Sequence, residues 1–178
     1  MPPHNNPKSF DAGIQKMTRI KHEHFIKCLQ AYCDSLFRSA DAQRQYRNLT
    51  GNTFVSYSCG IYIDGTLREI LLSSDYKKPP IRVKLAKGEV FSGKDYDGTF
   101  RRKYKANIET DRGLGVDTSL RFLRQHKPNV TKGYDVVMCT GTEYSEYIEK
   151  VRHINVLTNT YLMSSGLIAA NLKPIPNS

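Results

Sequence analysis

Three carboxylates that are close in the sequence are the residues with the most obvious chemical potential. Glu109, Asp111 and Asp117 surround two glycines. A two-metal nuclease needs carboxylates that converge on its metal ions, together with a basic surface that holds phosphates. A structural role competes with this interpretation, because Asp117 precedes a predicted short helix and is expected there as its N-cap. We therefore expect no catalytic site, and a metal-dependent nuclease is the weakest of the alternatives.

The histidines and cysteines do not form a recognisable site either. His22 and His24 are two residues apart in a predicted helix, so they point to different faces and cannot share a metal ion. Cys28 and Cys33 do not have a zinc-ligand spacing, and all four cysteines are expected to be reduced thiols. GxSxG, HExxH and phosphate-loop motifs do not occur. We expect a protein that is not an enzyme and that has no cofactor or metal.

Residues 77–105 are strongly basic. They hold ten basic and three acidic residues, a net charge of +7 out of +10 for the whole chain. Residues 81–85 alternate between apolar and basic, which predicts a strand with one basic face, and the glycines that follow indicate a flexible loop. Interleaved tyrosines and phenylalanines suit phosphate binding with base stacking, but contact with an acidic protein or plain solvation fits equally well. The residues expected to contact a partner or nucleic acid are Lys77, Lys78, Arg82, Lys84, Arg101, Arg102, Lys103 and Lys105.

A long helix is predicted near the N-terminus. Apolar residues recur at three- and four-residue steps from Asp11 to Tyr46, with charged residues on the opposite face. Ser39 and Asp41 compete with helical hydrogen bonds and mark a point where this helix could break. Three prolines within the first seven residues predict an extended arm over residues 1–10.

The remaining elements are predicted from turn residues and apolar runs. Asp64-Gly65 is a strong hairpin signal between a strand at 54–63 and a return strand at 66–72. The apolar run at 134–140 predicts a strand in the centre of the sheet. The other predictions are a turn at 49–53, a short helix after Asp117 that ends at 127–129, a helix or strand at 143–149, and a closing helix at 157–172.

These elements predict an α+β fold. In it, the long N-terminal helix and a C-terminal helix pack on an antiparallel β-sheet, and the basic segment 77–105 is a long loop insertion. We expect a single domain over residues 11–172, preceded by the arm and followed by a tail at 173–178. No apolar run approaches the roughly 20 residues of a membrane span, and the polar N-terminus is not a secretion signal.

Two segments resemble the neck, or tail-completion, proteins of tailed bacteriophages. In that family a long helix leads to a turn and a strand, and here Thr50-Gly51-Asn52-Thr53 follows the helix and precedes Ser56-Tyr57. Later in the family an apolar strand leads to a short tyrosine motif and a closing helix. Here Tyr144-Ser145-Glu146-Tyr147-Ile148-Glu149 occupies that position. The resemblance does not cover the proline-rich arm or the basic segment.

The resemblance implies a non-enzymatic subunit of a closed ring at the head–tail junction of a virion assembled in the host cytoplasm. The ring would bridge a portal or adaptor protein and a tail protein around the DNA channel. Tyr144, Tyr147 and Glu149 would then contact a neighbour, since tyrosines are favoured at interfaces and the glutamate can pair with a basic residue. Alternatively, both tyrosines pack in the subunit's own core. A basic accessory protein that contacts DNA non-specifically is the alternative function.

Overall fold

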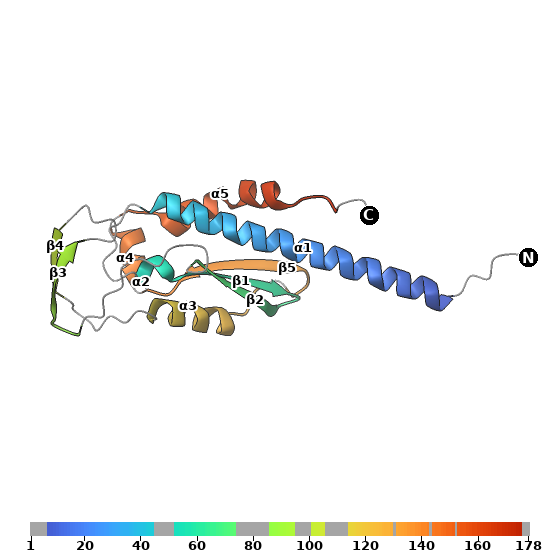
Figure 1. Cartoon of the computed structure of the whole chain (residues 1–178), viewed down its shortest axis with the longest axis horizontal. Coiled ribbons are helices and arrows are strands. Elements are labelled where there is room, and N and C mark those ends of the chain that lie inside the picture. The colour runs from blue at the N-terminus through green and yellow to red at the C-terminus, as the bar shows by residue number, and fades with distance from the viewer. Residues whose placement is uncertain are drawn as a thin grey trace, which may run out of the picture.

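The computed structural model gives ten helices and strands in the described part of the chain (Figure 1). It describes residues 7–44, 52–73, 86–94, 101–105, 114–129, 131–142, 144–151 and 153–175. The elements are α1 (Pro7–Gln43), α2 (Asn52–Val55), β1 (Tyr57–Ile63), β2 (Thr66–Leu72), β3 (Val90–Lys94), β4 (Arg101–Lys105), α3 (Leu114–Gln125), β5 (Tyr134–Thr140), α4 (Tyr144–Lys150) and α5 (Val156–Asn171).

Helices cover both faces of a three-stranded antiparallel sheet with the strand order β2-β1-β5. Helix α1 crosses one face, α3 packs on the other, and α5 lies along α1 on the side away from the sheet (Figure 1). The predicted α+β fold, with a long N-terminal helix, a C-terminal helix and an antiparallel sheet, is confirmed. None of the described helices combines the length and apolarity that crossing a membrane requires.

Strand β1 is buried on both faces because it lies between α1 and α3. Cys59 and Ile61 join the core formed with Leu29, Cys33 and Leu36 of α1. On the other face the Tyr62 hydroxyl donates a hydrogen bond of 2.6 Å to the carbonyl of Leu123 in α3. A side chain at Gly60 would collide with Tyr62 and crowd Leu123, so this glycine lets α3 approach the sheet closely.

The hairpin turn predicted at Asp64-Gly65 is confirmed. Both residues have positive φ, 49° and 76°, as a two-residue type I′ turn requires. The turn is also tied to the start of β5, because the Asp64 amide donates to the Gly133 carbonyl and the Gly133 amide donates to the Asp64 carboxylate, each at 2.8 Å. Strand β5 follows with the bounds that the sequence predicts.

Helix α1 differs from its prediction at both ends. It begins at Pro7, so residues 7–10 are helical and not part of an extended arm. Proline is well accommodated in the first turn of a helix, where the backbone N–H that it lacks would have no partner. The helix also continues without a break past Ser39, whose hydroxyl donates to Met163 Sδ at 3.7 Å and so does not disrupt the helical backbone. Residues 1–6 and 45–51 lie outside the described part of the chain.

Two predictions about strands were wrong. The strand predicted from residue 54 begins at Tyr57, because Asn52–Val55 form the short helix α2 and occupy the end of the predicted turn. Strand β5 lies at an edge of the described sheet and not at its centre. Its apolar sequence has another cause: α1 and α3 contact it from opposite sides, so neither of its faces needs polar side chains.

The basic segment also contains regular structure where a loop was predicted. Strands β3 and β4 pair antiparallel, from Val90 with Lys105 to Lys94 with Arg101, and form a separate two-stranded ribbon. Aromatic and β-branched residues favour this pairing, and Phe91 lies opposite Tyr104. The ribbon lies at the end of the molecule opposite the N-terminus of α1 (Figure 1). The strand predicted at residues 81–85 lies outside the described part.

Candidate interaction surfaces

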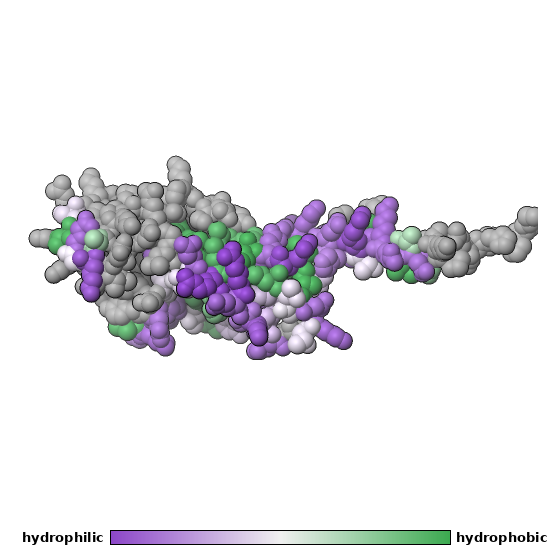
Figure 2. All heavy atoms as spheres, turned by 90° about the horizontal axis from the view of Figure 1, so that it is seen from below, coloured by the Kyte–Doolittle hydropathy of each residue, from purple (hydrophilic) through white to green (hydrophobic). Residues whose placement is uncertain are grey.

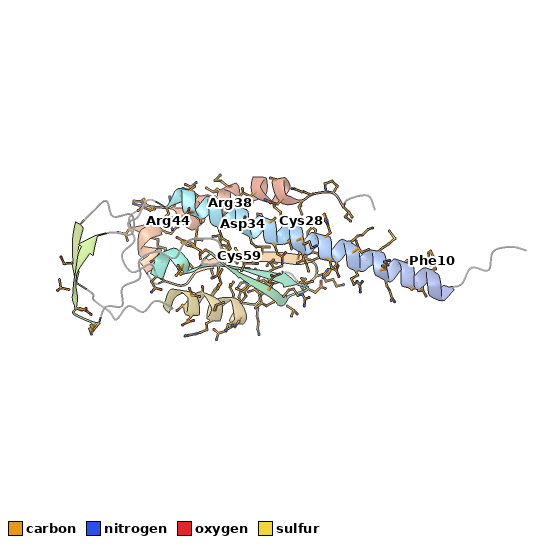
Figure 3. The ribbon with its side chains drawn as sticks, viewed as in Figure 1. Phe10, Cys28, Asp34, Arg38, Arg44 and Cys59 are labelled. Atoms are coloured by element: carbon orange, nitrogen blue, oxygen red, sulfur yellow. The ribbon has the colours of Figure 1, made fainter. Side chains whose placement is uncertain are left out.

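The N-terminal half of α1 projects beyond the sheet and the other helices (Figure 1). Phe10, Ile14, Met17 and Ile20 recur at steps of four, three and three residues, so they form one stripe along the helix. All four are exposed, Phe10 at 69% and Met17 at 60%. Figure 3 shows Phe10 near the free end of the helix, away from the other elements, whereas Cys28 lies above the body of the molecule. We call these four residues the α1 stripe.

Helix α5 presents a second exposed apolar surface. Its inner face packs against α1, and Val156 and Thr160 are buried there. On the other side Tyr161 and Leu162 are 76% and 71% exposed, next to small side chains. The helix contains no charged residue. We call one exposed side of this helix the outer α5 face; it consists of Thr158, Tyr161, Leu162, Ser165, Gly166 and Ala169.

Figure 2 shows how apolar surface is distributed on one side of the molecule. Hydrophobic residues gather over the middle of the body and appear again near the end of α1, with hydrophilic surface between them. Exposed apolar groups of this size on a folded protein commonly mark sites of contact with other proteins. Figure 2 is seen from below and does not face α5, so the outer α5 face is judged from the exposure of Tyr161 and Leu162. With the α1 stripe, it is the strongest candidate for partner contact among the described residues.

Glu149, which the resemblance places at an interface, is engaged within its own chain. Its carboxylate accepts hydrogen bonds from the Leu157 amide at 2.7 Å and from the Thr158 hydroxyl at 2.9 Å. Amides in the first turn of a helix have no partner within that helix, and the Asn155 side chain at the N-cap makes no capping hydrogen bond. Glu149 therefore caps α5. Contact between Glu149 and a neighbouring subunit stays a prediction.

Tyr144 and Tyr147 lie in α4, so the segment that fitted either a helix or a strand is a helix. The contacts of their side chains lie outside the described part of the structure, and the interface prediction for them stays a prediction. On the same helix Glu146 and Lys150 form an exposed ion pair of 2.6 Å, which lowers the pKa of the glutamate and raises that of the lysine.

The two segments that resemble the phage neck proteins meet in space. The Ser56 and Thr140 hydroxyls are 2.6 Å apart, and the Thr142 hydroxyl donates to that of Thr53 at 3.3 Å. Asn52 accepts a hydrogen bond of 2.7 Å from the Gly115 amide at the start of α3. This network of hydroxyl and amide groups ties α2, β5 and α3 together. The sequence did not predict it, since its members are distant along the chain and form no motif.

A groove of about 490 Å³ lies where the C-terminal residues meet α1. His22 and Tyr134 are joined across it by a hydrogen bond of 2.6 Å, and Phe25 packs on the Tyr134 ring. His24 instead faces the Lys173 carbonyl, with its Nε2 at 2.9 Å from that oxygen. The two histidines thus have different partners, although both line this groove.

Of the three carboxylates that could form a nuclease site, only Asp117 lies in the described part of the chain. Glu109 and Asp111 lie outside the described residues. Asp117 is exposed and lies in the first turn of α3, which begins at Leu114, so its predicted role as N-cap was wrong. A carboxylate in a first turn still interacts favourably with the helix dipole. In the described ranges no three histidine, cysteine, aspartate or glutamate side chains are grouped so that they could hold a metal ion.

The basic residues predicted to contact a partner fall into two groups. Lys77, Lys78, Arg82 and Lys84 lie outside the described part of the chain. Arg101, Arg102, Lys103 and Lys105 lie in β4, and the structure places that strand in the ribbon but does not describe their side chains. It therefore brings the second group together on one short strand at one end of the molecule (Figure 1).

The four cysteines are free, and three of them, Cys28, Cys33 and Cys59, are buried. Burial raises the pKa of the Cys59 thiol well above its ordinary value and raises the pKa of Cys139 to about 12. Cys59 and Cys139 are therefore protonated at neutral pH and poor nucleophiles, because the thiolate is the reactive form.

Comparison with protein-family models, with curated proteins and with solved structures finds no match to this chain.

Proposed function

We propose that this protein is a structural subunit of a tailed-phage virion, which forms a ring at the head–tail junction. The ring bridges a portal or adaptor protein and a tail protein around the DNA channel. The observation that carries the proposal is the α1 stripe, a row of large apolar side chains on a helix that projects from the body. A projecting apolar surface suits a protein whose working state is an assembly.

The energetics favour a partner for this part of the helix. Isolated helices shorter than about 12–15 residues are marginal in water, so the projecting turns gain little from helix propensity alone. Full burial of one large apolar side chain contributes roughly 1.5–3 kcal/mol. A partner that covers the α1 stripe would therefore both order this half of the helix and gain most of its affinity from four side chains.

The resemblance to the neck proteins gives the proposal its location. The segments that carry it, at residues 47–57 and 136–149, are joined through the contacts of Thr53 with Thr142 and of Ser56 with Thr140. These hydrogen bonds support the resemblance, because two segments that matched the family by chance would not need to be neighbours in the fold.

The test is the mass distribution of the purified chain over a wide range of concentrations, followed by electron microscopy of the assembled fraction. We expect uniform rings with a central opening, formed either by the chain alone or on addition of phage heads or tails that lack their neck. A chain that stays monomeric and binds neither heads nor tails would rule out the proposal.

A basic DNA-binding protein is the second candidate, and the β3–β4 ribbon favours it. Two-stranded ribbons enter DNA grooves in some DNA-binding proteins, and β4 has the sequence Arg-Arg-Lys-Tyr-Lys. Neutralising Arg101, Arg102 and Lys103 should lower DNA affinity. It should also reduce the slope of log affinity against log salt concentration by up to about one for each phosphate contact that is lost. Unchanged affinity in that variant would remove this candidate.

A further inference from the structure

We propose that the projecting half of α1 in one copy packs lengthwise on the outer α5 face of the next copy. This inference rests on the proposed function and specifies the surfaces through which the ring closes. The α1 stripe is the donor surface, the outer α5 face is the acceptor surface, and a second copy of this chain is the occupant.

The described part of the chain does not cover these surfaces by itself. Helix α1 is continuous from Pro7 to Gln43, and its C-terminal half is fixed between the sheet and the inner face of α5 (Figure 1). The α1 stripe is therefore held away from the outer α5 face of its own copy. Both surfaces lie on separate, non-overlapping parts of the molecule, so each is open to another copy at the same time.

The two surfaces match in length and in chemistry. At 1.5 Å per residue, the stripe from Phe10 to Ile20 is about 15 Å long, and the face from Thr158 to Ala169 is about 16 Å long. Because α5 contains no charged residue, an apolar stripe can dock on it without desolvating an unpaired charge. On the opposite side of α1, the exposed Arg19–Glu23 ion pair stays in solvent when the stripe is covered.

Two glycines inside the helices point to close packing by another molecule. Gly13 lies beside the α1 stripe and Gly166 belongs to the outer α5 face. Apart from the neighbouring backbone of its own helix, a Cβ added at either position would meet no atom of the described structure within 4 Å. Glycine inside a helix destabilises it by roughly 0.5–1 kcal/mol relative to alanine. The described residues give no steric reason for either glycine, whereas close approach of a second helix gives a reason for both.

The geometry produces a head-to-tail contact. Each copy offers one stripe and one face, so each makes two contacts, and such heterologous contacts close into a ring when the rotation between copies permits. Pairing of stripe with stripe would instead give a symmetric dimer and leave the outer α5 face exposed. The two arrangements predict different cross-links between copies.

The test mixes two full-length variants that differ in size through a tag. One carries Met17→Cys and the other Leu162→Cys, at two exposed positions. A short bismaleimide should join the two variants to each other. A mixture of Gln15→Cys with Leu162→Cys is the matched control, because Gln15 lies on the opposite side of α1 and should cross-link at least about tenfold less.

The cross-links separate this inference from the proposed function. Cross-links between the Met17→Cys and Leu162→Cys variants support it. Cross-links among Met17→Cys chains alone show stripe-to-stripe pairing and overturn it. Rings seen by electron microscopy without either cross-link also overturn it, yet leave the ring function standing. Absence of both rings and cross-links overturns it as well, and the binding of the chain to heads or tails then decides the function separately.

A substitution gives a second readout that is independent of cross-linking. Gly166→Leu adds a side chain where the chain has open space, so the monomer should unfold at the same or a higher denaturant concentration. The same side chain should block the neighbouring helix and weaken self-association at least about tenfold. Unchanged self-association in this stable variant would overturn the inference.

Discussion

The two halves of helix α1 have the same kind of apolar spacing and opposite surroundings. In the C-terminal half, Leu29 and Cys33 are 2% and 0% exposed between the sheet and α5. In the N-terminal half, Phe10 and Met17 also recur at helical spacing, on a face rotated away from that of Leu29 and Cys33, and both are exposed to solvent. Periodicity in a sequence thus predicts which side of a helix is covered, but it does not predict whether the cover belongs to the same chain.

The difference also separates two kinds of stability. Side chains of the covered half, such as Leu36, hold the subunit together because the sheet and α5 both depend on them. Side chains of the α1 stripe touch little of their own chain, so the free energy that they can contribute is realised only on assembly. Substitutions in the two halves should therefore change different measurable quantities.

The largest effect is expected in the covered half. Leu29→Ala removes a buried side chain from the centre of the core and should lower the free energy of unfolding by about 2–5 kcal/mol. Urea denaturation followed by circular dichroism measures it. A loss below about 1 kcal/mol would mean that this half of the helix is not packed as described.

Alkaline pH should weaken the covered half as well. Burial raises the pKa of the Cys59 thiol and of the Tyr32 phenol, both in this core. The folded chain then keeps protons that the unfolded chain releases, so stability is fully present below about pH 8.5 and falls as pH rises toward 12. Cys139, with its pKa raised to about 12, acts in the same direction. Denaturation curves that stay unchanged from about pH 8 to 11 would contradict this.

A smaller effect is expected from destabilising helix α5, which packs on the C-terminal half of α1. Glu149→Ala removes the acceptor for the Leu157 amide at the start of α5 and should cost about 1 kcal/mol of unfolding free energy. Glu149→Gln, which keeps an acceptor oxygen, is the control and should lose clearly less. Equal losses in both variants would show that the charge and not the hydrogen bond matters. Thermal unfolding of both variants side by side distinguishes the two.

The smallest effect is expected in the projecting half. Met17→Ala should change the free energy of unfolding of the dilute chain by no more than about 0.5 kcal/mol, since the side chain is exposed. At concentrations where the chain assembles, the same change should weaken association. A loss of several kcal/mol in the dilute chain would show that the projecting half is packed in the monomer, which would remove the contrast within α1.

The sequence was sufficient to predict elements with strong local signals. The Asp64-Gly65 turn fixes a hairpin through the positive φ of two residues, and the bounds of the strand at 134–140 follow from one apolar run. Strand order was not predictable in the same way. Strand β5 looks like a central strand because α1 and α3 cover both of its faces, and those contacts come from distant parts of the chain.

The candidate surfaces were harder to predict than the fold. Phe10 belongs to the predicted extended arm, and Ile14 and Met17 belong to the apolar spacing of the predicted helix. Only the arrangement of the other elements shows that nothing in the described structure covers these three residues. Glu149 shows the reverse case. The resemblance assigned it to a partner, but its carboxylate reaches the first turn of α5, eight residues further along the chain, and caps that helix.

Strand β1 pairs with β2 and with β5, and the segments that connect the two strands of each pair differ greatly in length. The hairpin turn has two residues, whereas everything from β2 to α3, including the β3–β4 ribbon, lies between the strands of the second pair. Loop-closure entropy grows only slowly, by about 0.6 kcal/mol for each doubling of loop length. The chain between Leu72 and Leu114 should therefore tolerate large insertions, which makes it the place to graft a fluorescent protein or an affinity tag for following the subunit during assembly.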